Sequence, residues 1–162
     1  MLNLFKKKKQ DTIYAPCSGE VIPITTVNDP VFSQKMLGNG FAIVPTLTDK
    51  TICAPIAGKI TSIFPSKHAI NIKNDTGIDY LIHIGLDTVE LKGKPFSILV
   101  EENETVTPEK LLVKVAFDQI IQAKKDPSVI VVFTQDSQIN ELSLTTGSVL
   151  CGEACGKINR TK

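Results

Sequence analysis

Short runs of apolar residues alternate with clusters of proline, glycine, asparagine and aspartate along most of the chain. The runs are rich in isoleucine, valine, phenylalanine and threonine, residue types that favour β-strands. They predict strands at 13–14, 19–24, 40–45, 51–54, 58–64, 69–73, 79–84, 96–100, 111–117, 129–134 and 148–151. Many short strands at this spacing are typical of an all-β sandwich or barrel.

Helix signals are confined to two stretches. In NDPVFSQKMLGNG (28–40), Asp29 is a candidate N-cap, Pro30 suits the first helical position and Gly38 is a candidate stop. FDQIIQAKKDP (117–127) predicts one or two turns, capped by Asp118 and ended before Pro127. We therefore expect one or two short helical turns beside the strands.

One short pattern occurs twice. APCSGEV (15–21) and APIAGKI (54–60) share the form Ala-Pro-x-x-Gly-x-aliphatic, 39 residues apart. Pro-x-x-Gly suits a β-turn that leads into a strand, because proline fixes φ and glycine adopts conformations that other residues resist. The two copies indicate either a structural duplication or two similar turns.

The two histidines of the chain, His68 and His83, lie in KHAINIKNDTGIDYLIHIG (67–85). Residues 74–77 are a turn signal between two alternating runs, which predicts a β-hairpin. A loop at 74–77 places Lys73 opposite Ile78 and His68 opposite His83. Opposed residues share a sheet face, with Cβ atoms about 4.5–5.5 Å apart, so we expect neighbouring imidazoles. A register slip of one residue would put them on opposite faces.

A pair of imidazoles has specific chemistry. Two protonated rings would repel each other, so at least one should be neutral near pH 7. A neutral imidazole can be a nucleophile, a metal ligand or a hydrogen-bond donor to an anion. The pair could also be two structural strand histidines, but the neighbouring Ser66, Lys67 and Asp87 favour a functional site. Ile70 and Leu81 are expected to extend this face as an apolar patch.

Composition and charge exclude several classes of protein. A length of 162 residues fits one domain, and 42% apolar with 22% charged residues describe a soluble globular chain. A net charge of +1 gives no electrostatic affinity for nucleic acid. No stretch approaches the ~18 apolar residues of a membrane span. Lysines at 6–9 stand where a signal peptide would need apolar residues, so we expect a cytoplasmic protein with reduced thiols.

The N-terminal residues are expected to form a flexible basic tail, residues 1–11, ahead of a single domain at 12–162. The simpler interpretation of this tail is a solvated, disordered segment without a function of its own. The alternative is contact with an anionic membrane surface, with Leu2, Leu4 and Phe5 as a small apolar anchor beside the lysines. Ten residues make a weak anchor, which favours the first interpretation.

Four cysteines, Cys17, Cys53, Cys151 and Cys155, are too few for a disulfide scaffold. Cys151 and Cys155, in CGEAC, have a spacing that zinc tolerates, but no second cysteine pair accompanies them. We therefore interpret them as incidental thiols.

The stretch GIDYLIHIGLDTV (77–89) resembles the active-site signature of the glucose-family enzyme IIA components of the bacterial sugar phosphotransferase system. In that signature a glycine and apolar residues precede His-aliphatic-Gly-aliphatic-x-Thr-aliphatic. ELKGKPF (90–96), FPSKHAI (64–70), DPVFSQKMLGNGFAI (29–43) and both Ala-Pro turns extend the resemblance over roughly residues 12 to 150. It implies the fold of that family, an antiparallel β-sandwich with a duplicated motif, as a single EIIA type-1 domain.

The resemblance also implies a reaction. His83 would accept a phosphoryl group on Nε2 from the phosphohistidine of the small phosphocarrier protein HPr and pass it to a cysteine of the EIIB domain of a membrane sugar permease. His68 would donate a hydrogen bond to the phosphoryl oxygens. The hydroxyl of Ser66 would orient His68, and the carbonyl of Gly85 would orient His83 through Nδ1. The reaction requires no cofactor.

The resemblance further implies a docking surface for these partners. Its apolar candidates are Phe41, Phe64, Ile70 and Leu81, which would keep water away from a labile phosphohistidine. Phe41 and Phe64 could equally be core residues. Asp87 would lie at the rim and meet arginine on HPr.

Two other functions stay open at this point. One is a zinc-dependent site built from His68, His83 and Asp87, or a zinc site that His68 and His83 share with a partner protein. The other is a regulatory binding module, in which phosphorylation of His83 changes which target proteins the apolar face accepts.

Overall fold

The structure of the protein, a computed structural model, describes residues 8–161. Within this range the largest sheet has eight strands, and neighbouring strands are antiparallel. Their spatial order is β13 (Gly147–Val149), β2 (Gly19–Pro23), β3 (Gly38–Pro45), β11 (Val129–Thr134), β7 (Asp79–Ile84), β6 (Ala69–Lys73), β5 (Gly58–Ile63) and β9 (Thr105–Val106). Because β13 and β9 form two edges, the sheet is open and not a closed barrel.

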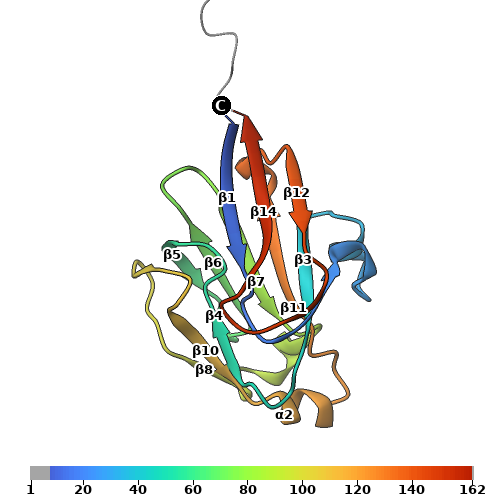
Figure 1. The fold of residues 1–162 in the computed structure, drawn as a ribbon. Helices are drawn as coiled ribbons and strands as arrows, with labels where there is room; N and C mark the ends of the chain where they lie inside the picture. The colour runs from blue at the N-terminus through green and yellow to red at the C-terminus, as the bar shows by residue number, and fades with distance from the viewer. Residues whose placement is uncertain (1–7, 162) are drawn as a thin grey trace, which may run out of the picture.

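Two smaller antiparallel sheets accompany the large one. One has the order β4 (Thr51–Cys53), β10 (Leu111–Val115), β8 (Phe96–Ile98), and the other has the order β1 (Lys8–Tyr14), β14 (Ala154–Thr161), β12 (Glu141–Leu144). Figure 1 shows β1, β14 and β12 side by side, with β4, β10 and β8 below them. The predicted all-β antiparallel sandwich is confirmed.

The large sheet buries side chains on both of its faces. Residues alternate along a strand, so Phe41 and Ile43 of β3 point to one face and Ala42 to the other. The first face belongs to the main core, which also contains Tyr80, Ile82, Val131 and Phe117. The second face carries a smaller cluster made of Ile24, Val27, Phe32, Ala42, Leu86, Ile130 and Val132. This smaller cluster, which we call the outer cluster, lies beside the histidines described below.

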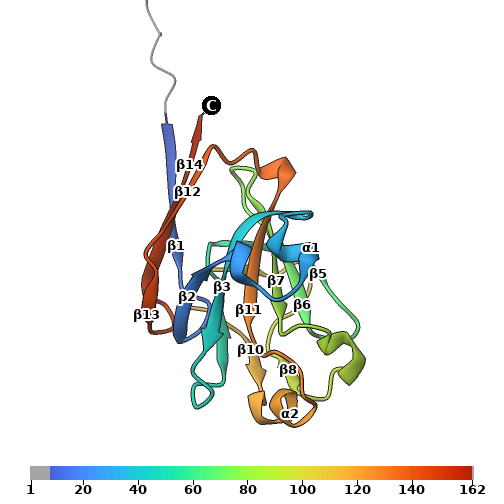
Figure 2. The same ribbon diagram turned by 90° about the vertical axis from the view of Figure 1, so that its right-hand side faces the viewer.

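The helical segments are short. Helix α1 (Pro30–Ser33) begins after Asp29, whose side chain accepts a hydrogen bond from Val31 N at 2.9 Å, so the predicted cap is confirmed. Four residues cannot sustain an isolated helix, and burial of Phe32 in the outer cluster stabilises it by about 1.5–3 kcal/mol. Figure 2 shows α1 in front of the large sheet.

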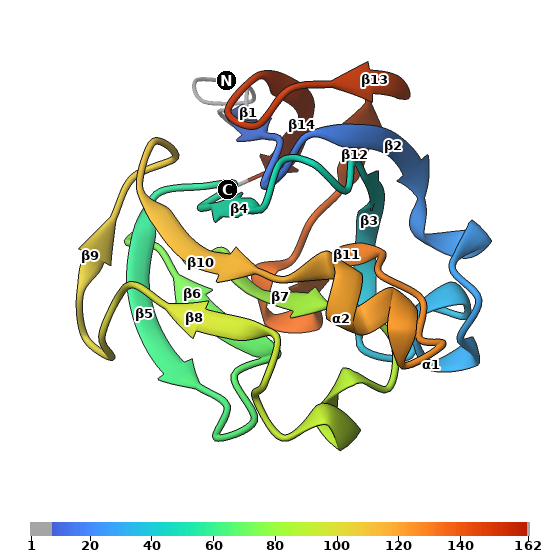
Figure 3. The ribbon, with the colours of Figure 1, turned by 90° about the horizontal axis from the view of Figure 1, so that it is seen from below.

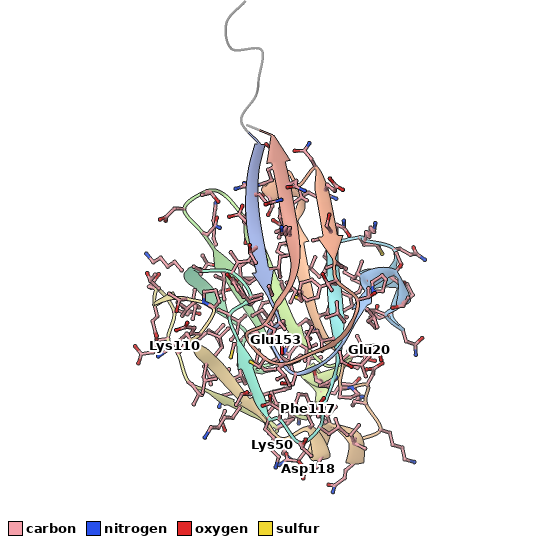
Figure 4. All side chains as sticks on the ribbon, in the orientation of Figure 1. Glu20, Lys50, Lys110, Phe117, Asp118 and Glu153 are labelled. Atoms are coloured by element: carbon pink, nitrogen blue, oxygen red, sulfur yellow. The ribbon has the colours of Figure 1, made fainter. Side chains whose placement is uncertain are left out.

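Helix α2 (Phe117–Gln122) departs from the predicted capping. Ala116 is its N-cap, two residues before the predicted cap, and Asp118 lies within the first turn without a capping hydrogen bond. Figure 4 labels Phe117, which is fully buried, beside the exposed Asp118.

Three 3-10 turns, η1 (Ile24–Thr26), η2 (Thr88–Leu91) and η3 (Gln135–Ser137), complete the elements. Within residues 8–161, no helix is long and apolar enough to cross a membrane.

Most predicted strands are present. Strands β6, β7 and β11 have the predicted bounds, and β2, β3, β4, β5, β8, β10 and β13 differ from prediction by one or two residues at their ends. Strands β9, β12 and β14 were not predicted, because their sequences lack a continuous apolar run. Strand β1 starts at Lys8, so the boundary expected between a flexible tail and the domain at residue 12 is corrected. Residues 1–7, which make up the rest of the predicted tail, lie outside the described residues.

The two Ala-Pro turns contact each other reciprocally. Tyr14 N donates to Pro55 O at 2.9 Å, and Cys53 N donates to Pro16 O at 2.7 Å. Each donor is the residue before its Ala-Pro pair, and each acceptor is the proline of the other copy. This exchange relates the copies by a local two-fold arrangement, which favours duplication over two unrelated turns.

Candidate functional site

The two histidines lie side by side on the large sheet. His83 is in β7 and half-buried, while His68 directly precedes β6 and is buried. Their ring centroids are 5.0 Å apart and the rings are nearly perpendicular, at 80°. The prediction that the two imidazoles are neighbours is confirmed.

The register that led to this prediction is wrong by one residue. Lys73 pairs with Asp79 and Ala69 pairs with His83, so the hairpin loop contains residues 74–78 rather than 74–77. The side chain of Asn74 accepts hydrogen bonds from the backbone N–H groups of Thr76 and Ile78, which stabilises the longer loop. The fully buried Ile78 belongs to the main core, which also favours this loop.

A turn before β6 brings His68 to His83 despite the shifted register. Lys67 adopts a left-handed conformation with φ of 60°, and its N–H donates to Phe64 O at 2.8 Å. His68 therefore lies outside the regular strand and does not follow its alternation of faces. Opposite His83 the strand carries Ala69, whose single methyl group leaves room for the ring of His68.

Aromatic side chains flank both histidines. Phe64 contacts His68 edge-on, with ring centroids 5.4 Å apart, and Phe32 of α1 contacts His83 at 5.0 Å. The four rings form a row, Phe64–His68–His83–Phe32, which we call the aromatic row. The row restricts the rotation of both imidazoles and shields them partly from water.

The backbone after β7 orients His83. Its Nδ1 lies 2.8 Å from Gly85 O, so the neutral ring donates its proton there and keeps an unprotonated Nε2. The contact predicted between His83 and the Gly85 carbonyl is present. Gly85 has φ of 77°, and a Cβ at this position would lie 2.4 Å from Thr88 Cγ2, so only glycine fits. Thr88 fixes the turn by donating to Ile84 O at 2.5 Å.

Burial keeps His83 neutral. Burial, with a smaller contribution from the neighbouring His68, lowers the pKa of His83 to about 4. The carbonyl of Gly85 and the carboxylates of Asp29 and Asp87 act in the opposite direction and only partly offset these causes. At neutral pH the unmodified ring therefore has a free lone pair on Nε2.

This shift predicts a pH dependence of stability. The unfolded histidine has a pKa of about 6.5, so between this value and about 4 the unfolded state binds a proton that the folded state does not. The linked stability is fully present above about pH 6.5 and is lost as the pH falls toward 4. From pH 7 to pH 5, the wild type should lose about 2 kcal/mol more free energy of unfolding than His83→Gln. Urea denaturation measures both, and a difference that does not change with pH would contradict the shift.

His68 interacts with the backbone of Ser66 and not with its hydroxyl. Burial lowers the pKa of His68, and the Ser66 backbone partly offsets this. Nδ1 of His68 is buried without a hydrogen-bond partner among residues 8–161. The predicted bond from the Ser66 hydroxyl is not formed in this described range.

Two of the predicted docking residues are core residues. Phe41 and Ile70 are 0% and 1% exposed and belong to the main core, so their assignment to a docking surface is wrong. The shifted register explains Ile70, which shares a face with Ile82 and not with the histidines. Phe64, Leu81 and Asp87 are at least partly exposed, consistent with their predicted place beside the histidines.

Two residues of the site were not predicted. Phe32 packs on His83 from α1, and Asp29, assigned only as the cap of α1, acts on the pKa of His83. The positions of these two residues in the sequence do not indicate that they lie near the histidines, because only the three-dimensional fold brings α1 to the site. Its short helical signal placed the helix but not the face on which it packs.

The residues that the structure describes offer no complete metal site. No three His, Cys, Asp or Glu side chains within 8–161 are grouped so that they could hold a metal ion. The alternative of a zinc site formed by His68, His83 and Asp87 alone is therefore corrected. A zinc ion at the two histidines would need further ligands from a partner protein.

The chain is similar to proteins of one family. The model of the phosphoenolpyruvate-dependent sugar phosphotransferase system, EIIA 1, matches residues 11–139. The glucose-specific EIICBA component of Streptococcus pneumoniae is 41% identical over 153 residues, which are 94% of this chain and 21% of that protein. The glucose-specific EIIA component of Staphylococcus aureus is 39% identical over 147 residues, covering 90% and 87%.

A solved structure agrees with these sequence relatives. The glucose permease IIA from Mycoplasma capricolum superposes with a TM-score of 0.84 and 34% sequence identity, covering 92% of this chain and 96% of that one. The chain thus spans most of the length of the Staphylococcus and Mycoplasma proteins and about a fifth of the Streptococcus EIICBA protein.

Proposed function

The chain belongs to the EIIA 1 family of the phosphoenolpyruvate-dependent sugar phosphotransferase system, and from this premise we propose that it carries phosphoryl groups on His83. The observation that carries the proposal is the pairing of His83 with His68 while Nδ1 of His83 is engaged by Gly85 O. This arrangement leaves Nε2 of His83 as a neutral, oriented nucleophile.

Each transfer exchanges one bond to phosphorus for another. Nε2 of His83 attacks the phosphorus of the phosphohistidine of HPr, and the N–P bond of HPr breaks as the new one forms. A cysteine thiolate of an EIIB domain then attacks the same phosphorus, and the bond to His83 breaks. Such transfers depend mainly on positioning and on stabilising the charge of the phosphoryl oxygens.

His68 supplies part of that stabilisation. Its ring lies 5.0 Å from that of His83, close enough for an N–H to reach an oxygen of a phosphoryl group on Nε2. The lowered pKa keeps His68 neutral, so it donates a hydrogen bond without forming a lasting ion pair with the phosphoryl group. A neutral donor stabilises the group during transfer and still lets it leave.

The proposed partners dock around the aromatic row. Phe64, which is 36% exposed, and Leu81 offer apolar contact, and the exposed Asp87 offers negative charge for a basic partner surface. The name of the Streptococcus relative joins an A part with C and B parts in one protein, which supports an EIIB domain as acceptor. We extend the glucose specificity in the relatives' names to the permease that this chain serves.

The proposal is tested by reconstituting the first transfer. The purified chain is incubated with phosphoenolpyruvate, enzyme I and HPr, and phosphate on the chain is measured by intact mass and by labelling. We expect one phosphoryl group per chain, labile in acid and stable in base, with or without a zinc chelator. Absence of the label, or a label that appears only with added zinc, would refute a phosphocarrier role that needs no metal.

A further inference from the structure

Two cysteine thiols meet far from the histidines. Cys53 ends β4, and Cys151 lies in the loop between β13 and β14. Their Sγ atoms are 2.8 Å apart, and a disulfide bond is about 2.05 Å long. The two sulfurs therefore need to approach by less than about 1 Å to bond.

The backbone holds both cysteines against residues 15–18. Cys53 N donates to Pro16 O at 2.7 Å, and Cys151 N donates to Ser18 Oγ at 2.9 Å. Ser18 Oγ in turn donates to Asp49 Oδ2 at 2.5 Å. Hydrogen bonds from Ala15 N and Gly152 N join the loop to the same segment. Backbone hydrogen bonds thus position both cysteines, and the contact between the two thiols follows from the fold.

The two thiols have different environments. Cys53 is 5% exposed, and its hydrogen bond with the neighbouring thiol, together with burial, raises its pKa, whereas Cys151 is half-buried and the hydrogen bond between the two thiols lowers its pKa. Burial and the carboxylate of Asp49 oppose this lowering of the Cys151 pKa but do not cancel it. Cys151 is therefore the thiol that reaches the thiolate form and meets solvent, and Cys53 is the thiol that can resolve it.

The other two thiols, those of Cys17 and Cys155, are buried and serve as a comparison for the reactivity of the pair. Cys17 and Cys155 are 0% exposed, and burial raises the pKa of both. The sequence spacing singled out Cys151 and Cys155, but the fold pairs Cys151 with Cys53, 98 positions away.

We propose that Cys53 and Cys151 are a redox-active pair that forms a reversible disulfide when the protein meets a hydroperoxide. The thiolate of Cys151 attacks one peroxide oxygen, and the O–O bond breaks to give Cys151 sulfenic acid and, from hydrogen peroxide, water. The sulfur of Cys53 attacks the sulfenic sulfur and displaces its hydroxyl, which leaves as a second water with the Cys53 proton. Two thiols are oxidised by two electrons, and one peroxide is reduced to two waters.

The pair is separate from the phosphoryl site. Figure 3 places β4 and the chain between β13 and β14 on the side of the molecule opposite α1, which packs on His83. Figure 4 labels Glu153 in the loop that carries Cys151. Cys151 also lies beyond residues 11–139, the part that matches the family model. The disulfide would tie β4 to this loop without covering the histidines.

The test counts thiols in the full chain. The reduced protein is treated with hydrogen peroxide, quenched in acid, alkylated with N-ethylmaleimide in denaturant and analysed by mass spectrometry. We expect the number of maleimides to fall from four to two per chain, with a peptide link between Cys53 and Cys151, and dithiothreitol to restore all four. Retention of four maleimides, a link between any other cysteines, or a link between two chains would overturn the proposal.

Serine variants separate the two roles. Cys155→Ser, the matched control, should still lose two thiols, whereas Cys151→Ser should keep all of its remaining three. Cys53→Ser should stop at the sulfenic acid of Cys151, which dimedone traps. Circular dichroism checks the fold of each variant, and the wild-type peptide map decides the outcome even if a variant does not fold. The readout involves no phosphoryl transfer, so it is independent of the proposed function.

Discussion

His83→Ala is expected to take up no phosphate from HPr, with the label falling to the detection limit of the assay. Of the two histidine rings only His83 has its Nδ1 engaged by a backbone carbonyl, Gly85 O at 2.8 Å, so only its Nε2 is oriented as a nucleophile. His68 is buried, and its Nδ1 has no hydrogen-bond partner within residues 8–161 that would orient its ring in the same way. Without the nucleophile no bond to phosphorus can form, so the substitution abolishes the transfer and does not merely slow it.

The control for this variant must preserve the packing of the outer cluster. His83→Gln retains more of the contact with Phe32 than alanine does and should be equally unlabelled. Circular dichroism and urea denaturation at pH 7 would show whether both variants are folded. A folded His83→Gln protein that still carries acid-labile phosphate would show that another residue is the acceptor.

The contact between the histidines was predictable, but its geometry was not. Turn signals at 74–77 and the alternation of two strands brought His68 and His83 together in the predicted hairpin. The loop is one residue longer, because the Asn74 side chain closes it and Ile78 is buried. A slip of one residue alone would have separated the rings, and the left-handed Lys67 restores the contact. Such compensation depends on backbone conformations that a residue pattern does not encode.

The errors in the docking surface have the same origin. Ile70 was assigned to the histidine face through the register, and the observed pairing with Ile82 moves it to the main core. Phe41 shares a strand with Asn39 and the buried Ala42, and nothing in this sequence indicates which face is covered by the other sheets. Long-range packing of α1 and the small sheets decides that question.

The strands missed near the C-terminus illustrate a different limit. Strand β14 contains lysine, asparagine and arginine and has no apolar run, yet it pairs with β1 from Tyr14–Ala154 to Lys8–Thr161. The backbone hydrogen bonds of that ladder, and the contacts of Arg160 with Thr76, hold it in place. Strand formation here follows from a partner far away in the sequence, and local propensity is only a weak guide.

Oxidation of the cysteine pair and phosphorylation of the histidine would act at separate places on one sandwich. The duplicated Ala-Pro turns contribute to the first of these, because Cys53, the residue before the second copy, donates a backbone hydrogen bond to Pro16 of the first copy. The histidines instead lie on the large sheet next to the outer cluster. One β-sandwich would therefore carry the proposed phosphoryl transfer on one side and the proposed disulfide on the other.

His68→Gln is expected to separate the two halves of the transfer. The variant should accept phosphate from HPr, because His83 keeps Gly85 O and Phe32 as its neighbours. Onward transfer to EIIB should slow by about 10²–10³-fold, the usual effect of removing one donor that stabilises transition-state charge. The amide of glutamine can donate, but it lacks the edge-on contact with Phe64 that fixes the ring of His68.

The matched control is Ser66→Ala, which removes a hydroxyl that makes no hydrogen bond to His68 and leaves the backbone group that does act on it. Its onward transfer should stay within about threefold of the wild type, since surface hydroxyls contribute little. Single-turnover mixing of each phosphorylated chain with EIIB measures the second step directly. Wild-type transfer by His68→Gln would remove His68 from the mechanism. Equal slowing by Ser66→Ala would instead restore the serine hydroxyl as the group that orients the ring.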